Sequence, residues 1–325
     1  MTVAADVFMK ERSMAIEQSK LKINIEWLSD CGGCHVAIVD LHEKILDVLG
    51  AAEILHCPVL TDIKSYPEAD VGIISGAIRT EHDRHAAEEM RKACRQIIAL
   101  GTCAVYGGLP GAALAHTREE ILDAVFVKNR TTATKTVPRA AVSPLEKMVT
   151  PLDEVISADL YLPGCPPHAT FIFDALLALL QNRSPKAKDE TVCGRCKRTM
   201  VKTAISRVRK NHEGTPKPDA CFLSQGYLCL GSVSLDRCLA PCPNNGVACT
   251  GCAGPTMQIL TEPNRDIRTE LAERMAKLTL IEEKEIVRTI EQSAKTHYAY
   301  AMATKMVGGK PTFLIQKWMA ETERQ

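Results

Sequence analysis

Cysteine spacing constrains this 325-residue chain more than any other feature of its sequence. Twelve of its fourteen cysteines form three sets of four, the first scattered beside glycines and the other two packed within sixty residues. The sets are Cys31, Cys34, Cys103 and Cys165; then Cys193, Cys196, Cys221 and Cys229; then Cys238, Cys242, Cys249 and Cys252. Because four thiolates are the ligands of a 4Fe–4S cluster, three sets on one chain predict a relay for electrons.

Closely spaced cysteines also serve other chemistry. Four thiolates bind zinc with the same tetrahedral geometry, so spacing alone does not separate zinc from iron–sulfur in the second and third sets. Cys31 and Cys34 by themselves could form a thioredoxin-like redox pair. Glycines in the Cys-Gly-Gly-Cys turn and around Cys103 and Cys165 instead favour a bulky inorganic group that the backbone approaches closely. For the first set, the sequence therefore favours a cluster.

Charge and hydropathy exclude several classes of partner. The 40 basic and 39 acidic residues nearly cancel and aromatic residues make up 4%, so the sequence predicts no nucleic-acid partner. No apolar run reaches about 18 residues, which predicts no membrane span. Residues 1–20 carry no apolar signal stretch and no twin-arginine pair, so we expect a cytoplasmic protein. In that compartment cysteines are metal ligands more often than disulfides.

The first half of the chain alternates predicted strands and helices. Strands are expected at 23–27, 53–60, 71–75, 96–100 and 160–162, and helices at 35–49, 81–95 and 169–180. This alternation predicts an α/β fold with a flavodoxin-like, doubly wound parallel sheet. Cys31 and Cys34 follow the first strand, Cys103 the fourth and Cys165 the fifth. Open α/β sheets bind ligands at the carboxyl ends of their strands, so we expect these four cysteines to converge.

Three regions are expected along the chain: an N-terminal extension (1–21), a flavodoxin-like domain holding the first set (22–185), and a cysteine-rich, cluster-organised domain with C-terminal helices (186–325). Residues 193–255 have few long apolar runs, so metal is expected to supply their core. Segment 128–157 is expected to cross the surface. A glycine break at 308–309 and a last helix near 313–320 are also expected.

The remaining candidate residues receive structural roles. Cys57 and Cys94, expected in a strand and a helix, are predicted to be small buried side chains. There is no phosphate-binding G-x-x-x-x-G-K-[ST] loop and no G-x-G-x-x-G after the first strand, so nucleotide binding is unsupported. No acid–base pair stands out, and we expect no catalytic residue on this chain. Many basic residues between 195 and 217 indicate either a solvated helix or a docking site for an acidic redox partner.

The cysteine loops resemble those of the small subunit of a nickel–iron hydrogenase. WLSDCGGC (27–34), GTCAVYGG (101–108) and LPGCPP (162–167) resemble the loops of the cluster nearest the active metal, and residues 221–238 and 242–255 resemble the two outer cluster loops. The run LHEKILDVL (41–49) and the absence of an export signal are most similar to the cytoplasmic third group, in particular the methyl-viologen-reducing type.

The resemblance implies a role for each set. The first set would bind a proximal, the second a distal and the third a medial 4Fe–4S cluster, with Cys242 as a fourth medial ligand that some relatives lack. The nickel–iron centre would lie on a partner large subunit, and electrons would pass to an electron-accepting subunit of a heterodisulfide reductase complex. Ser75 departs from the family, because many relatives have glutamate there.

Alternatives remain at this point. Small subunits of NAD(P)-linked or deazaflavin-linked hydrogenases share the same loops. A subunit resembling the B chain of a quinone oxidoreductase would share the sheet and one cluster but lack the eight outer cysteines. A zinc-organised structural protein and a ferredoxin-like carrier are the other classes.

Overall fold

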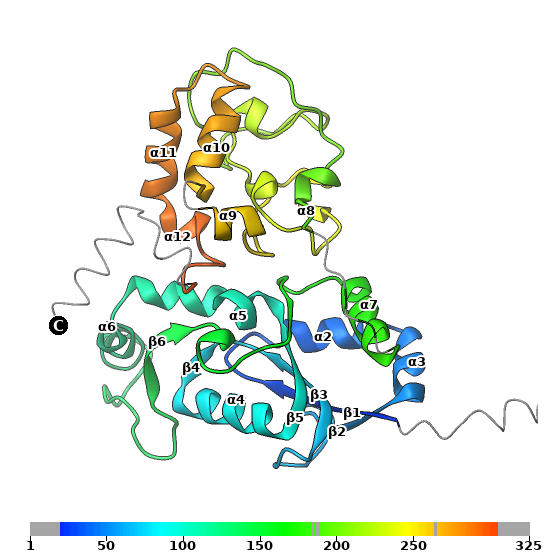
Figure 1. The fold of residues 1–325 in the computed structure, drawn as a ribbon. Helices are drawn as coiled ribbons and strands as arrows, with labels where there is room; N and C mark the ends of the chain where they lie inside the picture. Colours follow the sequence, from blue (N-terminus) through cyan, green and yellow to red (C-terminus); the bar gives the residue numbers. More distant parts are fainter. Residues whose placement is uncertain (1–19, 182, 184, 186–188, 263–264, 305–325) are drawn as a thin grey trace, which may run out of the picture.

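The computed structural model describes residues 20–304, except 182, 184, 186–188 and 263–264. In Figure 1 the described residues form a lower lobe built on a sheet and an upper lobe that contains the later cysteines. The boundary expected at 185/186 adjoins residues that are not described, and most of the expected extension 1–21 is also outside the described part.

A five-stranded parallel sheet in the order β2-β1-β3-β5-β7 is the centre of the lower lobe. This order is the flavodoxin-like, doubly wound arrangement, so the predicted fold class is confirmed. Six of the seven residues of β3 are buried, because helices cover both faces of the sheet. The strands are β1 (Leu21–Trp27), β2 (Ala52–His56), β3 (Ala69–Ser75), β5 (Cys94–Leu100) and β7 (Leu160–Leu162).

Two layers of helices cover this sheet. Helices α2 (Gly33–Val39), α3 (Lys44–Ala51) and α7 (Ala169–Leu180) share one buried cluster with Ile73 of β3. Helix α4 (Glu81–Ala93) lies on the other face, where Met90 packs in the same cluster as Ile74. Consecutive strand residues point to opposite faces, which explains why Ile73 and Ile74 belong to different clusters.

Several predicted boundaries were wrong for identifiable reasons. The helix expected at 35–49 is divided into α2 and α3, and His42 between them has a left-handed φ of 53° that a continuous helix does not allow. The second strand ends at His56, directly before Cys57 and Pro58, because proline has no N–H to give to a neighbouring strand. Cys94 begins β5 and does not lie in a helix, since the backbone becomes extended where α4 ends.

Segment 128–157 is not simply a surface excursion. It includes β6 (Leu145–Thr150), which pairs antiparallel with β4 (Ile78–Thr80). Val149 and Leu152 are almost fully buried, so this part of the segment packs into the core. The mostly polar composition of the segment concealed these few apolar side chains. Between β5 and this segment lie α5 (Gly101–Tyr106), η1 (Leu109–Ala115), α6 (Arg118–Leu122) and η2 (Asp123–Val127).

The upper lobe begins with short helical turns and ends with longer helices. Helices α10 (Ile267–Ala276) and α11 (Glu283–Gln292) pack against each other and, with α12 (Ala294–His297), confirm the expected C-terminal helices. The expected break at 308–309 and helix at 313–320 lie outside the described residues. The shorter elements are η3 (Leu152–Glu154) in the lower lobe, and η4 (Val192–Gly194), η5 (Leu223–Gln225), η6 (Leu230–Ser232), α8 (Pro241–Asn244) and α9 (Met257–Thr261).

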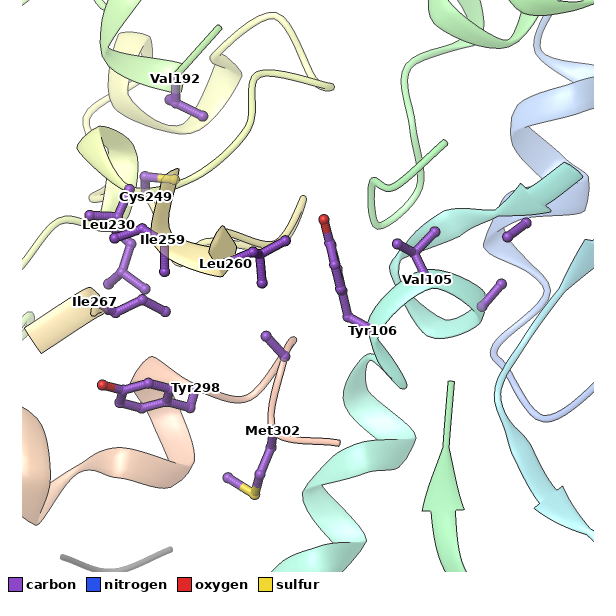
Figure 2. Packing of buried hydrophobic residues seen from close by; sticks show 14 of the residues in the cluster. Val105, Tyr106, Val192, Leu230, Cys249, Ile259, Leu260, Ile267, Tyr298 and Met302 are labelled. Carbon is purple, nitrogen blue, oxygen red and sulfur yellow. The ribbon is translucent and has the colours of Figure 1, made fainter. Parts of the chain in front are cut away.

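Apolar packing joins the two lobes. The larger buried cluster includes Ile74 of β3 and Ile286 of α11 as well as Tyr227 and Leu230, so segment 193–255 also contributes apolar side chains to a core shared by both lobes. Figure 2 shows the Tyr106 ring reaching from α5 toward Leu260 of the upper lobe. A β-carbon on Gly254 would lie 2.1 Å from this ring, which indicates how closely the upper backbone approaches it.

Candidate iron–sulfur sites

Three loops at the carboxyl ends of the sheet carry the first cysteine set. Cys31 and Cys34 lie at the start of α2 after β1, Cys103 lies in α5 after β5, and Cys165 follows β7. The four thiols are neighbours: burial raises the pKa of Cys34, and Asp30 and the other three cysteines of the set raise it further. The predicted convergence is therefore present in the structure.

Glycines leave room around these thiols. A β-carbon on Gly101 would lie 2.3 Å from Cys34 Sγ, and one on Gly108 would lie 2.6 Å from Cys103 Sγ. Both glycines also have positive φ, at 85° and 50°. The backbone thus approaches the sulfurs without any side chain between them, which fits a bulky inorganic group held by four thiolates.

The second set is brought together inside the upper lobe. Burial raises the pKa of Cys193 to about 12, and Cys229, Cys221 and Cys196 add to the shift through their charges. Gly231 adjoins this set, since a β-carbon on it would make ordinary contact with Cys193 Sγ at 3.4 Å and Cys229 Sγ at 3.7 Å. The donor set again consists of four neighbouring thiols.

The third set lies between the other two. Burial raises the pKa of Cys252 to about 12, with further contributions from Cys238, from Cys165 of the first set and from Cys242. The amide of Cys249 donates a hydrogen bond of 3.3 Å to Cys229 Sγ of the second set. On the other side, Thr102, directly before Cys103 of the first set, donates a hydrogen bond of 2.6 Å to the Cys252 carbonyl. The order in space is therefore first, third, second, which differs from the order along the chain.

The described thiols of each set are neighbours, but they are not spaced to coordinate a single metal ion. Within the residues that the structure describes, no group of three or more histidine, cysteine or carboxylate side chains has the spacing to hold a single metal ion. No helix in this part of the chain is both long and apolar enough to cross a membrane.

Two acidic residues, one beside the first set and one in β1, were not expected from the sequence. Asp30 Oδ1 accepts a hydrogen bond of 2.6 Å from the Gly32 amide, and its charge contributes to the raised pKa of Cys34. The buried Glu26 accepts a hydrogen bond from Tyr66 Oη (2.6 Å) and contacts His56 Nε2 (3.1 Å). A lone glutamate in the apolar strand INIEW was the available signal for this network.

Residues outside the three sets have structural surroundings. Cys57 and Cys94 are 1% and 3% exposed, and Asn24 Nδ2 contacts Cys94 Sγ at 3.6 Å. The basic segment 195–217 contains no helix, so the helical interpretation was wrong. Arg195 pairs with Asp236, and the Arg198 guanidinium lies 4.1 Å from the Phe222 ring centroid, so this segment partly stabilises its own lobe.

Comparisons with known proteins agree with this geometry. A family model described as NADH ubiquinone oxidoreductase, 20 Kd subunit, matches residues 31–179, which hold the first set. The chain is 40% identical over 237 residues to a subunit of the F420-non-reducing hydrogenase vhu of Methanocaldococcus jannaschii, covering 73% of this chain and 82% of that protein. The chain belongs to the family of F420-non-reducing hydrogenase small subunits.

Other members and relatives of this family extend the match. The corresponding subunit of the F420-non-reducing hydrogenase of Methanothermobacter thermautotrophicus is 32% identical over 296 residues, covering 89% of this chain and 96% of that protein. A chain from the crystal structure of an NAD+-reducing [NiFe]-hydrogenase in the H2-reduced state is 33% identical, with a TM-score of 0.51, over 52% of this chain and 96% of that one. The resemblance seen in the sequence is confirmed, and this hydrogenase small subunit is part of an oxidoreductase.

Proposed function

We propose that this small subunit relays electrons from H2 oxidation at a partner large subunit, which holds the nickel–iron centre, to a downstream acceptor through three 4Fe–4S clusters. The position of the third cysteine set between the first and the second is the observation that carries this proposal. When bound, such clusters take up and release single electrons. The chain itself would hold the thiolates, bury them and keep the sets at fixed separations.

Each set would hold one cluster. Cys31, Cys34, Cys103 and Cys165 would bind the proximal cluster, and the glycine-lined space beside Cys34 and Cys103 supports this assignment. Four cysteines are available for the medial cluster, so a four-iron cluster fits there. The medial ligands would be Cys238, Cys242, Cys249 and Cys252, and the distal ligands Cys193, Cys196, Cys221 and Cys229.

The large subunit would cover the carboxyl end of the sheet beside the first set. Trp27 at the end of β1, Val36 of α2 and Leu60 after β2 are all exposed despite their apolar side chains. Exposed apolar residues that gather at one end of a sheet are typical of a protein interface. We place the boundary between the two domains near 185/186. We also propose that the complex is cytoplasmic.

The acceptor would bind beside the second set. Exposed lysines of the neighbouring segment, Lys197, Lys202 and Lys210, would attract an acidic surface. An electron-accepting subunit of a heterodisulfide reductase complex is the acceptor that we propose. An NAD(P)-linked flavin subunit is the second candidate, because one similar solved chain comes from an NAD+-reducing hydrogenase.

Metal analysis of the anaerobically purified complex tests the relay. Three four-iron clusters predict about twelve iron atoms and as many sulfides in this chain, with a broad brown absorbance. A colourless small subunit with two or three zinc ions would instead support the zinc-organised structural protein and end this proposal.

The acceptor is tested by purifying the complex anaerobically from native cells and identifying each chain by mass spectrometry. We expect a nickel-binding large subunit together with heterodisulfide reductase chains. Flavin-binding chains in their place would keep the hydrogenase and replace the acceptor. Absence of any large subunit would contradict the proposed function.

The medial assignment is tested by Cys242→Ala. Loss of this thiol should convert the medial cluster to a three-iron form or remove it, with slower electron exit. The measurements are the electron paramagnetic resonance spectrum and H2-driven dye reduction. Unchanged spectra and full relay activity would show that Cys242 is not a ligand.

A further inference from the structure

We infer that the hydroxyl group of Thr102 helps to set the separation of the first and third cysteine sets and thereby the rate of electron exchange between them. Thr102 is a positioning residue in this role, because it touches the loops that carry the cysteines. The inference rests on the proposed relay.

Thr102 contacts loops of both sets at once. Its Oγ1 donates a hydrogen bond of 2.6 Å to the carbonyl oxygen of Cys252, in the third set. The same oxygen accepts a hydrogen bond of 2.9 Å from the amide of Gly164, directly before Cys165. Thr102 itself directly precedes Cys103 and is 1% exposed. A single buried hydroxyl therefore joins two loops of the lower lobe to one of the upper lobe.

A backbone hydrogen bond also joins the loops of Cys103 and Cys165. The Thr102 amide donates a hydrogen bond of 2.8 Å to the carbonyl oxygen of Gly164, so the loops of Cys103 and Cys165 are tied to each other independently of the side chain. The contact that the hydroxyl adds across the lobes is its hydrogen bond to Cys252, which holds this pair of loops against the upper lobe. Its donor and one of its acceptor positions are satisfied.

The second and third sets are joined in a different way. Cys249 donates its amide hydrogen to Cys229 Sγ at 3.3 Å, and Leu230 donates to the Cys249 carbonyl at 2.9 Å. These contacts are made within the upper lobe by the cysteine loops themselves. The link between the first and third sets crosses from one lobe to the other. There the Thr102 side chain bonds to Cys252, and the His168 amide, three residues after Cys165, donates a backbone hydrogen bond of 2.8 Å to the Arg237 carbonyl, directly before Cys238.

Loss of the hydroxyl has a defined consequence. The Gly164 amide and the Cys252 carbonyl would lose a partner in a buried position, which is unfavourable unless the loops move apart or water enters. Electron exchange slows as the separation of two redox centres grows. One electron crosses between the sets in this step, no bond is formed or broken, and the hydroxyl proton stays on Thr102.

The test compares the purified hydrogenase complex with its Thr102→Val variant, in which a methyl group replaces the hydroxyl. We expect the same iron content, the same H2/D2O exchange at the large subunit and a severalfold slower H2-driven reduction of a dye. The magnetic interaction between the first and third clusters in the electron paramagnetic resonance spectrum should weaken. Thr102→Ser keeps the hydroxyl and should restore both quantities.

Thr279→Val is the matched control. Thr279 is also buried, and its Oγ1 donates to the Met275 carbonyl at 2.8 Å and accepts from the Ile281 amide at 3.3 Å, at the end of α10. This variant loses an equivalent pair of bonds, so dye reduction and the magnetic interaction should stay at the level of the unaltered complex.

Three results would overturn the inference. The first is an unchanged rate and magnetic interaction in Thr102→Val. The second is an equal slowing in Thr279→Val. The third is loss of a cluster from Thr102→Val and Thr102→Ala but not from Thr102→Ser, because the hydroxyl would then be needed for assembly of the sites. If the unaltered complex itself contains no iron, the proposed relay fails, and that result is obtained before any variant is made.

Discussion

At the scale of single residues, the glycines beside the thiols decide how closely the backbone approaches each sulfur. Gly101 combines a positive φ of 85° with a position where a β-carbon would lie 2.3 Å from Cys34 Sγ. Gly194 follows Cys193 in the second set, yet a β-carbon there would meet nothing within 4 Å. A position next to a cysteine is therefore not enough to make a glycine necessary.

Gly101→Ala should destabilise the protein and reduce its iron content. The left-handed backbone costs a non-glycine residue about 1–3 kcal/mol, and the added carbon displaces Cys34 as well. Gly194→Ala is the control and should leave both quantities unchanged. The measurements are urea unfolding and iron per chain, and equal behaviour of the two variants would contradict the predicted role of Gly101.

Substitution of single cysteines should separate ligands from buried thiols. Cys249→Ala should lower the iron content, because Cys249 lies among the thiols of the third set and beside Cys229. Cys94→Ala should lower only stability, by about 1 kcal/mol for a small buried side chain, since Cys94 lies at the start of β5. Iron and sulfide analysis of both variants checks this. Loss of iron from Cys94→Ala would mean that the three sets are not the full ligand list.

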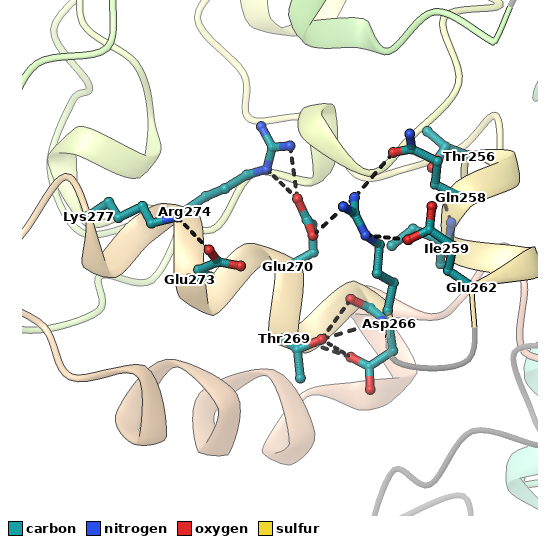
Figure 3. A network of polar contacts seen from close by, with 11 residues as sticks. Thr256, Gln258, Ile259, Glu262, Asp266, Thr269, Glu270, Glu273, Arg274 and Lys277 are labelled. Carbon is teal, nitrogen blue, oxygen red and sulfur yellow. Dashed lines mark hydrogen bonds and ion pairs between the residues drawn. The ribbon is translucent and has the colours of Figure 1, made fainter.

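At the scale of elements, α10 has a polar network that fixes where it begins (Figure 3). Asp266 is the N-cap and accepts from the Thr269 amide at 2.9 Å, in a capping box with the Thr269 hydroxyl. Arg268 Nε donates to Asp266 Oδ2 at 3.1 Å. Because α10 and α11 contact each other, this cap also supports the helical end of the upper lobe.

Asp266→Ala should lower the free energy of unfolding by about 0.5–2 kcal/mol, the usual cost of losing an N-cap. Glu273→Ala removes a carboxylate from the same helix, where it pairs with exposed Lys277, and should have little effect. Thermal and urea unfolding of both variants measure the difference. Equal stability of the two proteins would show that α10 does not depend on this cap.

At the scale of the whole molecule, Tyr106 is one of the residues that join the two lobes. Its side chain is buried against the upper lobe, and burial raises its pKa from 10.0 to about 12 (Figure 2). The unfolded chain therefore loses this phenolic proton first as pH rises. The contribution of Tyr106 to stability is complete below pH 10 and decreases between pH 10 and about 12.

Tyr106→Phe keeps the ring and removes the titrating group. When the pH is raised from about 8 to 11, the free energy of unfolding should fall less in this variant than in the unaltered protein. The difference should be roughly 1 kcal/mol, because the variant lacks the group whose pKa is raised. Urea unfolding at both pH values, without oxygen, gives the comparison. The same loss in both proteins would place the alkaline transition elsewhere, for example at Tyr298, whose pKa burial also raises.

Much of the lower lobe could be predicted from the sequence, because short apolar runs and glycine turns mark the strands of a parallel sheet. Helix α7 and strand β7 occur at the predicted positions 169–180 and 160–162. The break at His42 was not predictable in this way, since the apolar pattern continues through it. The pairing of β4 with β6 was also missed, because it joins segments about 70 residues apart.

The sequence by itself indicated how the cysteines group: close spacing marks the second and third sets, and glycine-bordered positions at the ends of predicted strands mark the first. These motifs also indicated the hydrogenase family. Only the tertiary structure decided that the third set lies between the first and the second, and that Thr102 joins two of them. These relations arise from the packing of one lobe on the other through Tyr106 and its neighbours. Contacts between residues far apart in the chain depend on that packing, which no local pattern records.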